Sequence, residues 1–163
     1  MNTDAVPSVL FVCMGNICRS PAGEGLFCAH LEENGLEDSV HVDSAGTIAY
    51  HTGNPPDPRM RRAAERRGYV LGGAARQVRE NDLSEFDLVV AMDRENLADL
   101  QRLADRAGGG HDRLRLLTDF TTDSQPIDVP DPYYGGDQGF ETVLDMIESA
   151  CPALLDTLLD GAR

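Results

Sequence analysis

The chain has 163 residues, of which 41% are hydrophobic, and this is enough for one sizeable core but short for two. We therefore expect a single domain over residues 1–163. The formal net charge of -14 argues against a nucleic acid or an anionic membrane as a partner, because both require a positively charged face.

The four cysteines, at positions 13, 18, 28 and 151, match neither a small secreted disulfide framework nor a zinc pattern. The N-terminus does not resemble a signal peptide, and no apolar stretch approaches the roughly 20 residues that cross a bilayer. We expect a soluble protein of the reducing cytoplasm.

The first predicted element is a buried parallel strand over residues 8–12, an apolar run that ends at Cys13. A tight loop follows, after which Ser20 is expected to cap a helix and Pro21 to occupy its first turn. Gly35 is a natural end for that helix. The order is strand, tight loop, helix.

A second short strand is predicted over residues 40–42, followed by a turn of small residues at 43–46 and a long loop. Asp57 and Pro58 then open a helix that Gly68 closes.

The clearest strand after the first covers residues 86–92, and Asp93 is expected to cap the next helix. Hydrophobic residues recur at three- and four-residue intervals from Phe140 to Leu158, which predicts a long amphipathic helix with a kink at Pro152.

Strands that alternate with helices in this way predict an α/β fold, with a parallel sheet covered by helices on both faces. Ligands bind to such sheets beyond the carboxyl ends of the strands. Cys13 lies at that end of the first strand, so the loop after it is the expected site.

That loop is a candidate phosphate-binding loop, because it places a thiol and a guanidinium around a helix N-terminus. Its backbone N–H groups form an anion nest, and the helix dipole favours the same charge. These fields favour Cys13 as a thiolate nucleophile, while the planar fork of Arg19 grips a phosphoryl group. The predicted phosphate-binding residues are Met14, Gly15, Asn16, Ile17, Cys18, Arg19 and Ser20.

Residues 9–21 resemble the signature of the low-molecular-weight protein tyrosine phosphatases, and the likeness covers nearly the whole chain. It continues in Asp43-Ser44-Ala45-Gly46-Thr47, Pro56-Asp57-Pro58-Arg59, Ala75-Arg76-Gln77, Met92-Asp93 and Asp131-Pro132-Tyr133-Tyr134. The resemblance implies a four-stranded parallel sheet of flavodoxin-like order. It also implies a two-step hydrolysis of phosphomonoesters through phosphocysteine, with no metal or other cofactor.

The resemblance assigns further roles. Asp131 is the general acid, a role that suits a carboxyl held by Pro132 and kept protonated near a dianionic substrate. The assigned rim residues are Tyr50, Tyr133 and Tyr134. The residues assigned to support the loop are Asn16, Ser20 and Ser44.

Cys18 matches a loop cysteine that forms a reversible disulfide with the nucleophile in this family, and the alternative is a small buried core residue. The chain departs from the family at Gly72 and Gly73, where a histidine is usual, so one hydrogen-bond partner of the loop is lacking.

Other candidate residues are interpreted structurally. Cys28 and Cys151 are expected in the core. The histidines are too scattered to bind a metal, and the arginines of residues 59–67 are expected on a solvated helix face.

Three other functions stay open: an arsenate reductase, a protein arginine phosphatase and a phosphate-binding adaptor without catalysis. The first needs further cysteines, and none lies between positions 29 and 150. For the second, Thr is typical where this chain has Ile17. We expect a tyrosine-phosphorylated protein as substrate and phosphate or other oxyanions as inhibitors.

Overall fold

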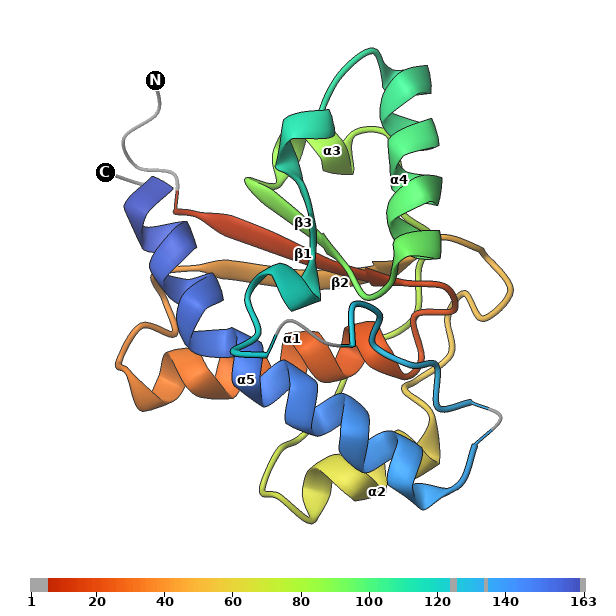
Figure 1. The fold of residues 1–163 in the computed structure, drawn as a ribbon, viewed down its shortest axis with the longest axis vertical. Helices are drawn as coiled ribbons and strands as arrows, with labels where there is room; N and C mark the ends of the chain where they lie inside the picture. The colour runs from red at the N-terminus through yellow and green to blue at the C-terminus, as the bar shows by residue number, and fades with distance from the viewer. Residues whose placement is uncertain (1–5, 124–125, 134, 162–163) are drawn as a thin grey trace.

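The protein is built around one parallel four-stranded sheet with the strand order β2-β1-β3-β4 (Figure 1). The computed structural model describes residues 6–123, 126–133 and 135–161. The strands are β1 (Ser8–Cys13), β2 (His41–Gly46), β3 (Leu88–Ala91) and β4 (Leu114–Leu116).

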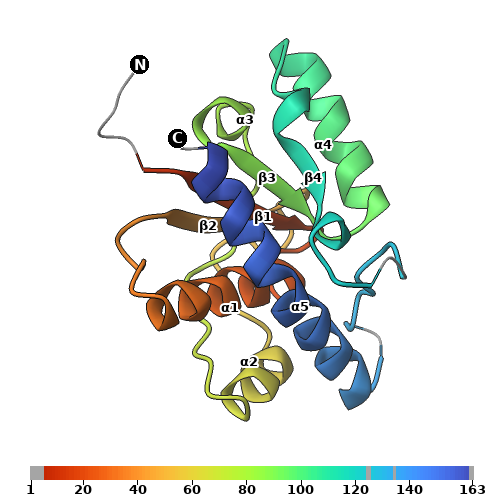
Figure 2. The same ribbon diagram turned by 60° about the vertical axis from the view of Figure 1, so that its left-hand side comes forward.

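Helices cover both faces of the sheet, so the predicted three-layer α/β/α arrangement is confirmed. In both ribbon views α1 and α5 lie on one face, α4 lies on the other, and α2 packs beside α5 (Figures 1 and 2). The helices are α1 (Arg19–Glu33), α2 (Pro58–Glu65), α3 (Asp82–Glu85), α4 (Arg94–Ala107) and α5 (Asp137–Gly161), with short 3-10 turns at η1 (His111–Arg113) and η2 (Leu117–Asp119).

The central position of β1 follows from its residues, all six of which are buried. Val9 and Phe11 contact the core beneath α1 and α5, whereas Leu10 and Val12 contact the core beneath α4. A strand between two helical layers needs apolar side chains on both faces, which is why it appears as a continuous apolar run. This strand brings Cys13 to the carboxyl edge of the sheet.

The second strand is longer than predicted, and the prediction of a turn at residues 43–46 is wrong. Ser44, Ala45 and Gly46 continue β2 and pair with the last residues of β1. Small residues are needed here because the loop after β1 lies against them: a Cβ on Gly46 would stand 2.7 Å from the carbonyl oxygen of Met14. Close packing thus explains a pattern that is also typical of turns.

The helix caps are partly as predicted. Asp57 accepts a hydrogen bond from the backbone N–H of Arg59 at 2.8 Å, and Asp93 accepts one from Asn96 at 2.7 Å. The prediction that Ser20 caps α1 is wrong. The helix begins at Arg19, one residue before Ser20, and the hydroxyl of Ser20 contacts the sulfur of Cys13 instead. Gly108 ends α4 with a φ of 82°, and α5 continues through Pro152.

The arginines of the α2 region are only partly solvated. Arg66 and Arg67 form ion pairs with Glu141, and Arg67 also reaches Asp145 and Glu148. These contacts tie the end of α2 to α5, so the prediction of a solvated face is wrong for Arg67, whose side chain is 23% exposed.

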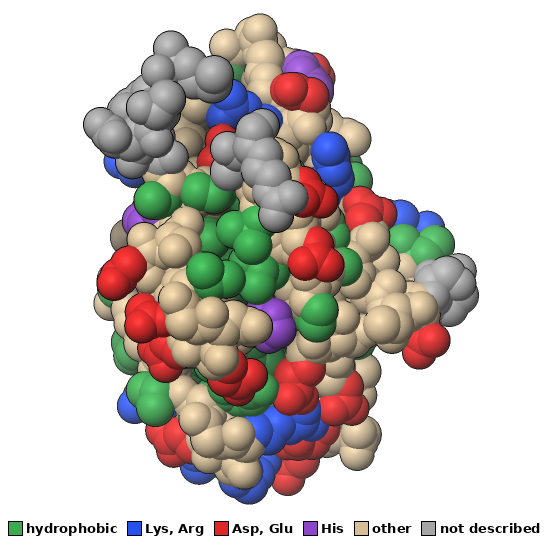
Figure 3. Space-filling model, turned by 90° about the vertical axis from the view of Figure 1, so that its left-hand side faces the viewer, with side chains coloured by type: hydrophobic (Ala, Val, Ile, Leu, Met, Phe, Trp, Pro, Cys, Tyr) green, Lys and Arg blue, Asp and Glu red, His purple; other side chains and the backbone are tan. Residues whose placement is uncertain are grey.

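Acidic side chains are spread over the surface, as Figure 3 shows for one face of the molecule. None of the helices that the structure describes combines the length and the apolar character needed to cross a membrane.

Candidate active site

The loop between β1 and α1 folds back over the end of its own strand. Asn16 adopts a φ of 57°, a left-handed conformation that this residue type tolerates better than most. Its backbone N–H consequently points at the sulfur of Cys13, at 3.3 Å. The loop thus has the nest-like form in which N–H groups converge on an anion.

The sulfur of Cys13 has a second polar neighbour in the hydroxyl of Ser20, at 3.0 Å. Ser20 lies in the first turn of α1, where its side chain faces the loop rather than the helix end. Cys13 is only 3% exposed, and it lines the pocket described below. A backbone N–H and a hydroxyl next to one sulfur suit a thiolate that attacks a substrate and later leaves again.

Arg19 is held rigidly beside the loop. One guanidinium nitrogen, Nη1, donates to Oδ2 of Asp93 at 2.6 Å and to the carbonyl oxygen of Val129 at 3.0 Å. Burial alone would lower the pKa of Arg19, but the negative charges of Cys13 and Asp93 outweigh it and raise the pKa. The group therefore stays charged, and its other terminal nitrogen, Nη2, faces the pocket wall at Asp131, where it can meet an oxyanion.

Asp131 faces Arg19 from the loop that precedes α5. Its Oδ2 lies 3.7 Å from Nη2 of Arg19, while Oδ1 accepts a hydrogen bond from the backbone N–H of Tyr133 at 3.0 Å. The side chain is 35% exposed and lies at the pocket wall. A carboxyl in this position can exchange a proton with a group bound above the Cys13 sulfur.

The side chain of Asn16 organises the support behind the loop. Its amide nitrogen donates to the hydroxyls of Ser20 at 2.8 Å and Ser44 at 3.1 Å, and its oxygen accepts from the backbone N–H of Arg76 at 3.0 Å. Asn16, Ser20 and Ser44 are all buried. Their side chains lie outside the lining of the pocket, where they can hold the loop without touching a substrate.

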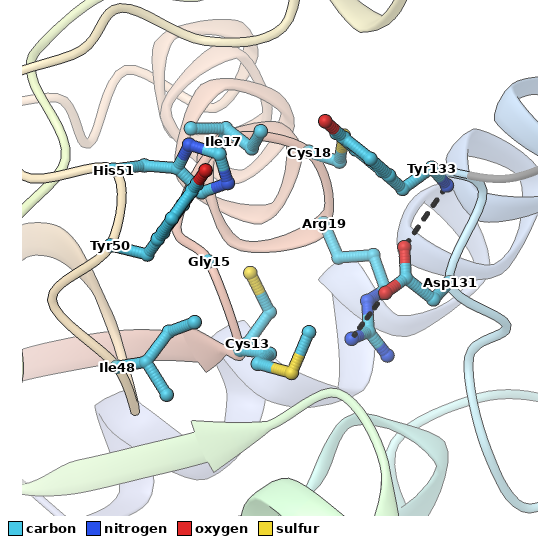
Figure 4. A pocket seen from close by; sticks show the side chains of 11 residues that line it. Cys13, Gly15, Ile17, Cys18, Arg19, Ile48, Tyr50, His51, Asp131 and Tyr133 are labelled. Atoms are coloured by element: carbon cyan, nitrogen blue, oxygen red, sulfur yellow. Dashed lines mark hydrogen bonds and ion pairs between the residues drawn. The ribbon is translucent and has the colours of Figure 1, made fainter.

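The pocket above the loop has a volume of about 260 Å³. Tyr50 and His51 lie on one side of it, and Asp131 and Tyr133 lie opposite (Figure 4). Its lining residues are Cys13, Met14, Gly15, Ile17, Cys18, Arg19, Ile48, Tyr50, His51, Asp131 and Tyr133. The result is a polar, cationic floor beneath aromatic walls.

Contacts beneath the aromatic walls hold them in place. The imidazole of His51 contacts Tyr50 edge to face, at 4.8 Å between ring centroids. The guanidinium of Arg59 lies over two rings, 5.4 Å from the centroid of Tyr133 and 5.1 Å from that of Phe140, within cation–π range. Tyr50 itself is 82% exposed, so much of its ring is available to a ligand.

The structure brings most of the predicted site residues to this one place. Tyr134 lies outside the described residues. Cys18 lines the pocket, and burial raises the pKa of its thiol above the ordinary value, as do the charges of Asp57 and Cys13. Its disulfide with Cys13 stays a prediction.

Sequence reasoning missed three residues of the site: Ile48, His51 and Asp93. Asp93 was assigned only as a helix cap, although its place after β3, next to β1 in the sheet, could have indicated contact with the loop. His51 follows Tyr50 directly, and that adjacency was its only signal. Among residues 6–123, 126–133 and 135–161, no group of His, Cys, Asp or Glu is arranged to hold a metal ion.

A thiol and a fixed guanidinium that share one anion nest, at the carboxyl edge of a parallel sheet, define a protein that binds an oxyanion against a sulfur nucleophile. Residues 8–162 match the family described as low molecular weight phosphotyrosine protein phosphatase, and the chain belongs to that family.

A curated relative from Streptomyces coelicolor, a low molecular weight protein-tyrosine-phosphatase, is 46% identical over 90% of this chain and 90% of its own. The crystal structure of a protein tyrosine phosphatase from Entamoeba histolytica, with Hepes in the active site, has a TM-score of 0.89 at 38% identity. It covers 96% of this chain and 99% of that one. A Drosophila arginine phosphatase structure has a TM-score of 0.85 at 29% identity, covering 91% of this chain and 96% of that one.

Proposed function

We propose that this protein is a tyrosine phosphatase that hydrolyses phosphotyrosine and other aryl phosphates through a phosphocysteine on Cys13. One observation carries the proposal: Cys13, Arg19 and Asp131 line a single pocket, with the carboxyl group of Asp131 3.7 Å from the guanidinium of Arg19. A nucleophile, an oxyanion clamp and a proton donor are the three groups that phosphoryl transfer from an aryl ester requires.

In the first step the phosphoryl group binds in the nest, against the loop N–H groups and Arg19. The Cys13 thiolate attacks phosphorus, so an S–P bond forms while the P–O bond to the aryl group breaks. Asp131 donates its proton to the departing phenolate oxygen, which leaves as a neutral phenol. The fixed guanidinium stabilises the charge that is spread over the equatorial oxygens.

In the second step a water molecule attacks the phosphocysteine, and Asp131, now ionised, takes the proton from that water. The S–P bond breaks, and Cys13 leaves as a thiolate that can accept a hydrogen bond from Ser20, whose hydroxyl lies 3.0 Å from the sulfur. Inorganic phosphate is the second product, and each group has returned to its first state.

The walls of the pocket favour an aromatic ester. Tyr50 and Tyr133 lie on opposite sides above the loop, with Ile48 and Met14 adding apolar surface. A phosphotyrosine ring can contact these walls while its phosphate reaches the nest. We infer a tyrosine-phosphorylated protein as the partner, and competition by phosphate and similar oxyanions.

An arginine phosphatase remains a second candidate, because the Drosophila enzyme shares the fold. Fold likeness alone does not decide between substrates. The bulk of Ile17 and the aromatic wall at Tyr133 favour phosphotyrosine over phosphoarginine as the substrate. We also infer that residues 1–163 form one domain that acts in the cytoplasm without a metal or other cofactor.

Turnover of phosphotyrosine, phosphoserine and phosphoarginine peptides, and of arsenate, tests the assignment. We expect the wild-type protein to prefer phosphotyrosine and to carry one phosphate on Cys13 when the reaction is quenched, as seen by mass spectrometry. Cys13→Ser should abolish turnover and still bind phosphate, because the nest and Arg19 remain. A phosphate found on Asp or His, or a preference for phosphoarginine, would contradict the proposal.

A further inference from the structure

A line of hydrogen bonds runs from the nucleophile to a carboxylate that lies behind the phosphate loop. Ser20 contacts the Cys13 sulfur, Asn16 donates to Ser20 and to Ser44, and Ser44 donates to Oε1 of Glu24 at 2.7 Å. Glu24 belongs to α1 and lies outside the pocket that receives the substrate. The last member of the line is therefore a charged group with no direct access to the reaction.

From the Arg76 N–H through Asn16 and Ser44 to Glu24, the donors can point in only one consistent direction. The backbone N–H of Arg76 donates to the Asn16 oxygen at 3.0 Å, which places both amide hydrogens toward the two serines. Because Ser44 accepts one of them, its own hydrogen goes to the carboxylate of Glu24. Ser20 accepts the other, so its hydrogen is left to point at the Cys13 sulfur or at the carbonyl oxygen of Ala45.

The orientation of Asn16 matters because its backbone is held in the left-handed region, at a φ of 57°. Asn tolerates this conformation better than most residues, but it still costs more than in glycine, so contacts from the surroundings help to hold it. It is also the conformation that directs the Asn16 N–H at the sulfur of Cys13. If Ser44 loses its fixed orientation, the side chain of Asn16 loses a partner, and the N–H that faces Cys13 is no longer held in place.

The surroundings of Glu24 explain why it is the partner of Ser44. A small cavity of about 50 Å³ lies beside it, bordered by Gly72 and Gly73, and a Cβ at either glycine would meet no atom within 4 Å. This is the segment where the sequence lacks the histidine expected from the family. Burial raises the pKa of Glu24, the hydrogen bond from Ser44 opposes the rise, and the charge of Asp43 adds to it.

We propose that Glu24 is a positioning residue of the phosphate loop, acting through Ser44 to fix the side chain of Asn16 and so to preorganise the anion nest at Cys13. The proposal rests on the proposed function only in that the oriented loop is the one that performs phosphoryl transfer.

Two substitutions separate the acceptor from the charge. Glu24→Met and Glu24→Gln both remove the negative charge at similar volume, but only glutamine keeps an oxygen that accepts from Ser44. We expect Glu24→Gln to bind inorganic phosphate within about threefold of wild type and Glu24→Met to bind it about tenfold more weakly, the scale of one coupled contact. The value of kcat/KM for phosphotyrosine should fall in parallel.

A double-mutant cycle shows whether the effect passes through Ser44. In a Ser44→Ala background, Glu24→Met should weaken phosphate binding no further. Glu32→Gln, an exposed position on the same helix, is the control and should behave as wild type. Circular dichroism checks folding, and Glu24→Ala replaces Glu24→Met if the methionine variant does not fold.

The outcomes are distinct. Equal phosphate affinity for Glu24→Met and Glu24→Gln, or losses that simply add in the Ser44→Ala background, would overturn the role of Glu24. If the wild-type protein does not turn over phosphotyrosine, the proposed function fails. The phosphate affinities of the variants, measured by calorimetry, still decide whether Glu24 positions the loop.

Discussion

The two oxygens of Asp131 have different partners, and this makes an amide substitution informative. Asn at this position keeps an acceptor for the Tyr133 N–H and loses the acidic proton. We expect Asp131→Asn to lower the rate of the first step about a hundredfold or more for aryl phosphates with a tyrosine-like leaving group. Substrates whose phenol is already acidic should lose much less, because their oxygen leaves as an anion unaided.

The measurement is the rate of phosphocysteine formation against the leaving-group pKa, for wild type and for Asp131→Asn. A steeper dependence in the mutant is the expected result. Parallel lines would show that another group donates the proton. Since Pro132 and the turn at Tyr133 remain, a change in fold is not the expected cause of a loss.

Glu24 also gives the protein a pH-dependent stability whose sign can be worked out. Burial and the charge of Asp43 raise its pKa above the ordinary 4.5, so the ionised form is less favourable in the folded than in the unfolded chain. This cost is present at neutral pH, and it disappears as the pH falls below the unfolded value, where both states are protonated.

We therefore expect Glu24→Gln to raise the melting temperature at pH 7, with a gain that shrinks as the pH approaches 4.5. Melting curves of the variant and of Glu32→Gln across this range provide the test. A gain that does not change with pH would assign the effect to packing instead. A residue that lowers stability at neutral pH and lies behind the loop fits a role in function.

At the scale of single residues, the sequence was most informative where a chemical reason fixed the residue type. A thiol and a guanidinium around a helix N-terminus predicted the place of Cys13 and Arg19, and the structure brings both to one pocket. The partners of Arg19 could not be predicted in this way, since Asp93 comes from a distant strand end. Contacts between strand ends depend on how the strands are aligned in the sheet, and a local sequence pattern does not indicate this alignment.

Asp93 joins two elements, and its two oxygens again separate two effects. One accepts from Asn96 and caps α4, while the other accepts from Arg19. Asp93→Asn keeps a good cap and loses the charge, whereas Asp93→Ala loses both. We expect both variants to lower kcat/KM by about tenfold or more, the scale of one charge-assisted hydrogen bond.

The contribution of the helix cap to stability is given by the difference in unfolding free energy between Asp93→Ala and Asp93→Asn. Urea unfolding should show Asp93→Ala about 1 kcal/mol less stable than Asp93→Asn. An asparagine variant with wild-type kcat/KM would mean that Arg19 keeps its orientation without the charge of Asp93, through contacts such as the one with the carbonyl of Val129.

At the scale of elements, long helices and strands could be predicted from the sequence and very short ones could not. The buried strand at 8–12 forms a continuous apolar run, and the long amphipathic C-terminal helix has a strong periodic pattern; both elements are confirmed. The strand β4 has three residues and the helix α3 has four, too short for either period to show. The second strand was cut short because its small residues are typical of turns, whereas close contact with the loop requires them here.

At the scale of the whole molecule, charge opposes the chemistry. The net charge is -14, and acidic side chains are spread over the surface seen in Figure 3. The proposed substrate carries a dianionic phosphate, which the protein as a whole repels while the nest and Arg19 attract it at short range. Long-range repulsion of this kind acts on the rate of encounter rather than on the bound state.

This balance predicts that salt affects substrates according to the residues that flank the phosphotyrosine. The Debye length falls from about 30 Å at 0.01 M salt to about 8 Å at 0.15 M, so the field of the molecule is screened while contacts inside the pocket persist. We expect kcat/KM to fall with salt for a peptide with basic flanks and to rise for one with acidic flanks, each by several-fold or more. A peptide with neutral flanks serves as the reference for effects of salt on the phosphate itself. If all three peptides respond alike, the repulsion arises at the pocket and not from the charge of the whole molecule.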